Sequence, residues 1–117
     1  MKVLPIKAII QFEDLEKIDI RVGKIEKVED VADSDKLVKL CVDFGSFKRT
    51  ILVGMKKERE NLREIEGKQA LFIVNLAPRK MMGEISEGML FDIGYANEIT
   101  PVLAVPEKDV PDGVNAG

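Results

Sequence analysis

The stretch IDIRVGKIEKVEDV, residues 18–31, decides the fold of this 117-residue chain. Its first half alternates apolar and polar residues, as a strand with one buried face does. The alternation then slips at Gly23 and again at Val28. A glycine at such a change of phase indicates a bulge or a sharp coil, which lets one long strand bend across two neighbours. The stretch therefore predicts the first strand of a small barrel.

The segments that follow predict two more strands and a helix. ADSDK (32–36) is a polar turn. The apolar residues of LVKLCVDF (37–44) alternate, and a short GSF turn leads into KRTILVGM (48–55), so a hairpin is expected. KKERENLREIE (56–66) is rich in helix formers and ends at a glycine, which predicts a helix.

Three apolar segments complete the pattern. QALFIVNL (69–76) is almost continuously apolar, as a strand buried on both faces would be. MLFDIGY (89–95) predicts a fifth strand, and TPVLAVP (100–106) a sixth at an edge, because its prolines exclude a central position. Before the first strand, Ile10–Lys17 predicts a short helix.

The order of elements is therefore strand, strand, strand, helix, strand, strand. This is the order of an oligonucleotide/oligosaccharide-binding (OB) barrel, whose open face commonly binds single-stranded nucleic acid. We expect an all-β fold with small α content: a five-stranded OB-fold barrel with a helix between strands 3 and 4, plus N- and C-terminal extensions. Residues 1–117 would form a single domain with a core from about residue 12 to residue 113.

Composition argues against catalysis and against a membrane span. The chain is 45 % hydrophobic and 33 % charged, as ordinary soluble globular proteins are. It contains no histidine, the commonest general base and metal ligand, and one cysteine cannot form a thiolate metal site. The lone Cys41 fits a reducing cytoplasm. We expect a cytoplasmic protein with no metal, no cofactor and no catalytic residues.

Charge is distributed unevenly along the chain. The net charge is −3, but residues 36–80 carry 11 basic and 5 acidic groups. Such a basic middle region can offer a local anion-binding face on an acidic protein. The residues with the fewest acidic neighbours in this region are Lys36, Lys48, Arg49, Arg79 and Lys80.

Several short motifs occur in a characteristic order. They are DIRVG (19–23), DSDKL (33–37), VG (53–54), NLAPRK (75–80), Gly83, SEGM (86–89) and VPDG (110–113). Together they resemble the tRNA-binding domain family. This domain occurs at the C-terminus or as a beta subunit of methionyl-tRNA synthetase, as a free-standing dimeric tRNA-binding protein, and in cytokine-like synthetase cofactors. The resemblance covers about nine tenths of the chain and implies an OB barrel that recognises tRNA by shape without catalysis.

The resemblance and the side-chain chemistry together select seven candidate tRNA-binding residues. Amide, hydroxyl and cationic groups suit bases, ribose and phosphate, and methionine offers a pliable apolar surface. Each residue also has a structural alternative: Asn75 and Ser86 as turn caps, Met89 as core, Arg21 and Lys36 in pairs with nearby aspartates, and the rest as solvated charges. The candidates are Arg21, Lys36, Asn75, Arg79, Lys80, Ser86 and Met89.

The aromatic content limits how RNA could be bound. The chain has no tryptophan, five phenylalanines and one tyrosine. Single-strand binders stack successive bases on aromatic side chains, and Phe44 and Phe72 are expected in the core. We therefore expect contacts with phosphate, ribose and overall shape, as folded RNA permits.

The expected partners follow from the resemblance. Free-standing members of the family are dimers, and the apolar starts and ends of this chain could meet across a two-fold axis. A methionyl-tRNA synthetase is a possible partner, and no membrane is expected. The alternative function is that of the export-type chaperones of the same fold, which are dimers that bind unfolded precursor proteins.

Overall fold

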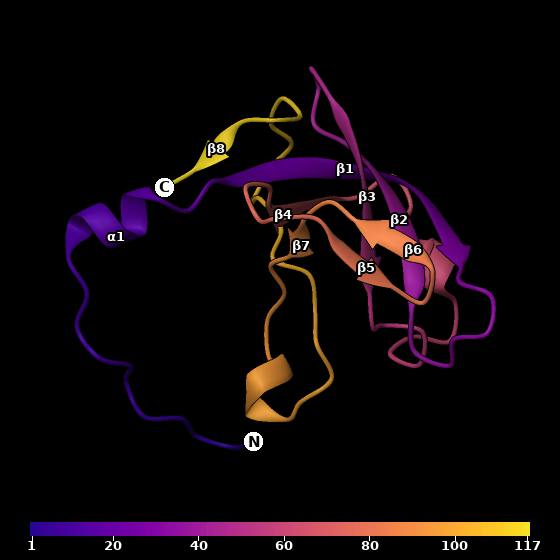
Figure 1. The fold of residues 1–117 in the computed structure, drawn as a ribbon, viewed down its shortest axis with the longest axis horizontal. Coiled ribbons are helices and arrows are strands. Elements are labelled where there is room, and N and C mark those ends of the chain that lie inside the picture. Colours follow the sequence, from indigo (N-terminus) through magenta and orange to yellow (C-terminus); the bar gives the residue numbers. More distant parts are fainter.

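The computed structural model describes all residues from Met1 to Gly117 and is built around one curled antiparallel sheet (Figure 1). The sheet has the order β3-β2-β1-β4-β7, with β8 beside β1, and β5 and β6 form a separate hairpin. The strands are β1 (Ile20–Asp30), β2 (Val38–Asp43), β3 (Lys48–Val53), β4 (Gln69–Ile73), β5 (Arg79–Met81), β6 (Glu84–Ser86), β7 (Met89–Leu90) and β8 (Asn115–Ala116). The helices are α1 (Phe12–Glu16) and the short 3-10 helices η1 (Leu62–Ile65) and η2 (Tyr95–Asn97). The predicted all-β class with small α content is confirmed.

Strand β1 bends across two neighbours, as predicted. Its first five residues pair with β4, and the part from Lys24 onward pairs with β2. The register shift lies between Ile25 and Lys27, so of the two predicted devices a bulge does not form at Gly23 itself, although the pairing partner of β1 changes at the next residue. Gly23 is needed for close packing instead, because a Cβ there would lie 2.5 Å from Val42 Cγ1.

The hairpin of β2 and β3 supplies a large part of the barrel interior. Val38, Leu40 and Val42 alternate along β2 and are completely buried. Phe44 follows them and packs edge-on against Phe72 of β4, with ring centroids 5.6 Å apart. The alternation of this segment therefore predicted its inward face correctly.

Side chains help to close the curled sheet between β3 and the segment around Glu87. The Glu87 N–H donates to the Thr50 carbonyl (2.8 Å), and the Glu87 carboxylate accepts from the Thr50 N–H (3.0 Å). One step along, the N–H of Leu52 donates to the hydroxyl of Ser86 (3.0 Å). The carboxylate and the hydroxyl here replace backbone acceptors that a continuous strand would provide.

The helix expected over residues 56–66 does not form, and only η1 occupies that region. The segment has just two apolar residues, Leu62 and Ile65, three positions apart, and Ile65 alone is buried. One turn is enough to place Ile65 in the core, while the side chains of Glu58 and Arg59 are largely buried instead of facing solvent. A longer helix would have no apolar stripe to pack on the barrel.

The second half of the chain differs from the expectation in four places. Residues 75–89, for which no strands were predicted, contain the β5–β6 hairpin. The expected fifth strand is reduced to β7, and the expected sixth to one bridge between Ile93 and Val102. The unexpected β8 pairs with the start of β1.

The first eleven residues extend away from the barrel and return to it at their beginning (Figure 1). The N–H of Lys2 donates to the Asn97 carbonyl, and the Asn97 amide donates to the Lys2 carbonyl, both at 2.8 Å. Between Lys2 and the start of α1, the residues Val3, Ile6 and Ile9 are largely exposed to solvent. No helix in the chain is both long and apolar enough to cross a bilayer.

Candidate nucleic-acid interface

The β5–β6 hairpin presents two basic side chains to solvent. Arg79 and Lys80 lie on β5, where they pair with Ser86 and Ile85 of β6. The turn at Met82 and Gly83 has positive φ at both positions (49° and 80°), as tight hairpin turns require. Arg79 and Lys80 are exposed and form no ion pair within the protein, so both cations are free to contact phosphate.

Apolar packing holds this hairpin against the loop between β1 and β2. The side chain of Met81 packs on a small buried cluster of Val31, Leu37 and Leu52. Leu37 directly follows Lys36, which is exposed and also has no ion pair. The cluster therefore ties the loop that carries Lys36 to the hairpin that carries Arg79 and Lys80.

Ser86 lies beneath this surface and not on it. Its side chain is buried, and its hydroxyl accepts from the N–H of Leu52 while donating to the Gly88 carbonyl, both at 3.0 Å. These contacts fix the hairpin to β3. Direct contact of Ser86 with RNA stays a prediction, and the geometry makes it a residue that positions its neighbours.

We expect the Ser86→Ala variant to lose about 1–3 kcal/mol of unfolding free energy, because the buried Leu52 N–H would lose its acceptor. Urea denaturation measures this loss, with Ser46→Ala as the control at an exposed turn position. A variant with unchanged stability but weakened RNA binding would instead make Ser86 a direct contact.

Asn75 and Arg21 meet at a second cluster, centred on Asp19. The Asn75 side chain accepts from the Asp19 N–H (2.8 Å) and donates to the Lys17 carbonyl (2.6 Å). Arg21 donates from Nε and Nη2 to the two carboxylate oxygens of Asp19 at 3.0 and 3.1 Å. Asn115 of β8 donates to the same carboxylate. The amide of Asn75 thus anchors the chain between α1 and β1.

The guanidinium groups of Arg21 and Arg49 both lie against the ring of Phe47, an arrangement that was not predicted from the sequence. The guanidinium of Arg21 lies 5.8 Å from the centroid of the Phe47 ring, and the guanidinium of Arg49 lies 5.0 Å from it. Arg49 is fixed by donating to the carbonyls of Val74 and Glu87 (3.3 and 2.9 Å). The hydrogen bonds that Arg21 donates to Asp19 raise the pKa of its guanidinium, so this group keeps its charge. The sequence pointed to this arrangement only through the positive charge of Arg49.

Carboxylates line the surface between the hairpin and β2–β3. A hollow of about 460 Å³ there is lined by Lys39, Thr50, Gly83, Glu84, Ile85 and Glu87. Lys39 pairs with Glu84 (3.6 Å), and Lys48 pairs with Glu26 (3.0 Å), which raises the pKa of Lys48. The basic middle region is therefore neutralised over much of this face. On the hairpin and the adjoining β1–β2 loop, Lys36, Arg79 and Lys80 are exposed and form no ion pair.

The structure thus places the seven candidates in several settings. Lys36, Arg79 and Lys80 belong to the connected loop and hairpin, and Ser86 supports them. Arg21 and Asn75 share the Asp19 cluster. Met89 lies on β7 opposite Ile73 and is about half exposed.

Comparisons with known proteins identify the family of this chain. The family model described as "Putative tRNA binding domain" matches residues 20–115. The chain belongs to the tRNA-binding domain family. This domain is a non-catalytic auxiliary module.

Relatives of the tRNA-binding domain include synthetases and a chaperone. A methionine–tRNA ligase from Parabacteroides distasonis is 43 % identical over 114 residues, which is 96 % of this chain and 16 % of that protein. The solved structure of a MetRS-related protein from Pyrococcus horikoshii is 32 % identical with a TM-score of 0.86, covering 95 % of this chain and 100 % of the other. The chaperone CsaA from Bacillus anthracis is 25 % identical with a TM-score of 0.76, covering 94 % and 100 %. The chain spans only about a sixth of the ligase relatives' length.

Proposed function

We propose that this domain binds folded tRNA through the surface formed by the β1–β2 loop and the β5–β6 hairpin. The observation that carries the proposal is that Lys36, Arg79 and Lys80 remain unpaired and exposed in a member of the tRNA-binding domain family. Arg21, Asn75 and Met89 lie outside this loop and hairpin, and their contact with RNA stays a prediction, while Ser86 holds the hairpin in place. Phosphate contacts by such cations position an RNA without reading its sequence.

The exposed aromatic residues support recognition of shape over recognition of a flexible strand. Phe44 and Phe72 are buried, and Phe47 lies against two guanidinium groups. Phe12, Phe91 and Tyr95 are exposed but lie outside β2 and β3. No row of stacking platforms follows the open face, so an unstructured strand would gain little there.

Fluorescence anisotropy with labelled tRNA and with unstructured RNA of equal length tests this proposal. We expect tRNA to bind at least about tenfold more tightly. We also expect its affinity to fall with salt with a logarithmic slope of about 3, because about three or four cations contact phosphate. Equal affinities for the two RNAs would contradict recognition of the folded shape.

A chaperone-like role is the second candidate, favoured by the CsaA neighbour and by an apolar hollow. This hollow of about 510 Å³ is lined largely by hydrophobic residues, among them Phe12, Leu15, Ile18, Leu71 and Phe91. Light scattering of a denatured client protein distinguishes the two functions. Suppression of aggregation together with no binding of tRNA would favour the chaperone role.

We also propose that the domain forms a homodimer in the cytoplasm and serves a methionyl-tRNA synthetase. The exposed apolar residues Val3, Ile6 and Ile9, together with Val102 and Val105, are surfaces that a second copy would cover. Sedimentation at micromolar concentration should give twice the monomer mass, and a sharp monomer would contradict the dimer. A synthetase partner should show a lower KM for tRNA when the domain is present.

A further inference from the structure

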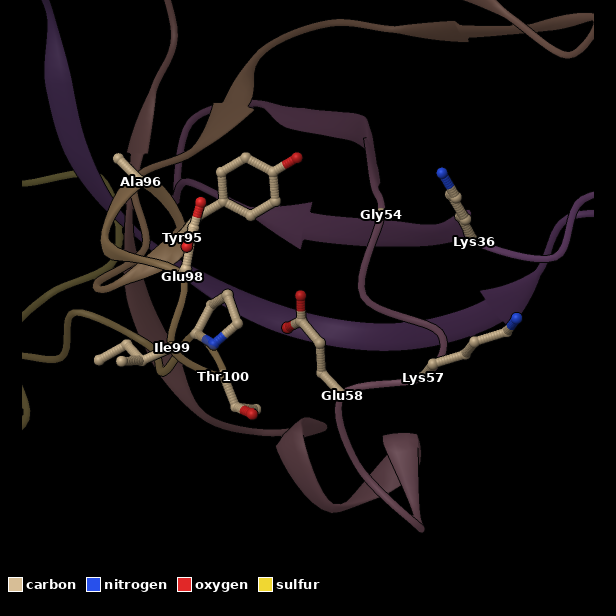
Figure 2. Close-up of a pocket in the computed structure, with 10 residues that line it drawn as sticks. Lys36, Gly54, Lys57, Glu58, Tyr95, Ala96, Glu98, Ile99 and Thr100 are labelled. Carbon is tan, nitrogen blue, oxygen red and sulfur yellow. The ribbon is translucent and has the colours of Figure 1, made fainter. Parts of the chain in front are cut away.

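The largest cavity of the molecule lies apart from the β5–β6 hairpin. It has a volume of about 770 Å³ and opens between three segments: the end of the β1–β2 loop, the segment after β3, and the segment that begins at η2. Figure 2 shows Tyr95 on one wall and Lys36 and Lys57 on the other. The lining includes the charged residues Lys36, Lys57, Glu58 and Glu98 as well as Tyr95.

Backbone contacts fix the walls of this cavity. The N–H of Lys56 donates to the Lys36 carbonyl (3.0 Å), and the Lys56 ammonium donates to the Ser34 carbonyl (2.6 Å). These bonds join the first two segments, and the fully buried Met55 anchors them in the core. The third segment is closed on itself by the paired bonds between Ile93 and Val102 (2.9 and 3.0 Å). Two walls of the cavity are therefore bonded to each other, and the third wall is held together by its own bonds.

The chemistry of the lining is that of a nucleotide site. Lys36 and Lys57 form no ion pair, so both ammonium groups can receive an anion. Tyr95 is 75 % exposed, so its ring is accessible to a planar group. The Glu58 carboxyl points into the space between these walls (Figure 2) and can accept hydrogen bonds from hydroxyl or amino groups.

The carboxyl of Glu58 is partly buried and has charged neighbours. Burial raises its pKa, the nearby Asp92 raises it further, and Arg59 opposes this change. Arg59 lies 3.6 Å from the Glu58 carboxylate, and its buried Nη1 has no hydrogen-bond partner. The Glu58 carboxylate therefore lies within ion-pair distance of Arg59 and also lines the cavity.

We propose that this cavity holds one unpaired nucleotide of a bound RNA, which extends the proposed tRNA-binding function. The phosphate lies against Lys36 and Lys57, the base stacks on Tyr95, and Glu58 accepts from the ribose or from an exocyclic amine. The volume suits such a ligand, since small-molecule sites measure roughly 300–1,000 Å³. Lys36 belongs to both surfaces, because it borders the cavity and follows the loop that Met81 holds to the hairpin.

The single tyrosine provides a direct probe of the cavity, because the chain contains no other. The full chain labelled with 3-fluorotyrosine gives one ¹⁹F resonance, from Tyr95. We expect adenosine 5′-monophosphate to shift this resonance in a saturable manner and ribose 5-phosphate to leave it nearly unchanged. No shift with the nucleotide, or an equal shift with an unstructured peptide, would overturn the proposal.

Variants test the two halves of the ligand separately. Lys57→Ala should weaken the nucleotide about fivefold, while Lys68→Ala, which removes another exposed and unpaired lysine, should not. Tyr95→Ala should weaken tRNA binding about tenfold, since a stacked base is worth roughly 1–3 kcal/mol. Unchanged tRNA affinity in Tyr95→Ala would overturn the nucleotide site and leave the proposed function intact. Binding of the nucleotide without binding of tRNA would contradict the proposed function and leave the nucleotide site intact.

Discussion

The Gly113→Ala variant is expected to lose about 3–5 kcal/mol of unfolding free energy, the largest effect expected for a glycine-to-alanine change in this chain. Gly113 has φ of +96°, which alanine rarely adopts. Its added Cβ would also lie 2.1 Å from the backbone oxygen of Phe44, an atom that cannot rotate away. Relief would require the loss of the bond from the Gly113 N–H to the Val22 carbonyl (2.7 Å).

Gly83→Ala is the matched control for this measurement. Gly83 also has a positive φ, +80°, but no atom lies within 4 Å of its added Cβ. We expect it to cost only about 1 kcal/mol, the strain of the backbone alone. Thermal unfolding should separate the two variants by roughly 10 °C or more, since 1 kcal/mol corresponds to about 4–8 °C in a domain of this size. Equal melting temperatures would show that the close approach at Gly113 is relaxed at no cost.

The double variant Arg79→Ala/Lys80→Ala is expected to bind tRNA about 10- to 50-fold more weakly at about 0.1 M salt. Both residues are exposed on β5 and unpaired, so each can displace a counterion from phosphate. The logarithmic salt dependence should fall by about two, one for each lost phosphate contact. Anisotropy titrations over a series of salt concentrations measure both quantities.

The control removes the same charge elsewhere. Lys68 and Lys108 are also exposed and form no ion pair, and they lie outside the β1–β2 loop and the hairpin. Lys68→Ala/Lys108→Ala should change affinity by less than about threefold and leave the salt dependence nearly unchanged. A similar loss in both double variants would mean that tRNA responds to overall charge and not to the hairpin.

The strands that the sequence predicted best are those with one fully buried face. Val38, Leu40 and Val42 alternate with polar neighbours over the whole of β2, so local pattern and burial coincide. The segment 56–66 shows the opposite case. Its helix formers favour a helix locally, but only Ile65 reaches the core, and tertiary packing selects a single turn.

The short strands could not be predicted because their stability comes from distant residues. Strand β5 depends on the packing of Met81 against Val31, Leu37 and Leu52, which belong to other parts of the chain. Strand β8 has two residues and no apolar pattern, and its position follows from its bonds to β1. Neither contact leaves a local signal in the sequence.

In the candidate site, the chemical type of each residue could be predicted from the sequence, but its contacts could not. Exposed cations at Arg79 and Lys80 could be predicted from charge and from the turn residues around them. Asn75 forms hydrogen bonds with Lys17 and Asp19, which lie 58 and 56 positions earlier in the chain. The Ser86 hydroxyl accepts a hydrogen bond from the N–H of Leu52, which lies 34 positions earlier. Only the folded chain reveals which polar groups are already occupied.

The pairing of β8 with β1 also bears on how the domain is made in the cell. One edge of Ile20 and Arg21 is covered by Ala116 and Asn115, which are synthesised more than ninety residues later. While the nascent chain is still on the ribosome, the edge at Ile20 has no partner there and is open to pairing with other strands. Contacts of such long sequence separation also form slowly. The barrel can therefore be completed only after residues 113–116 have left the ribosomal exit tunnel. The start of β1 is synthesised long before its partner β8 and has to wait for it.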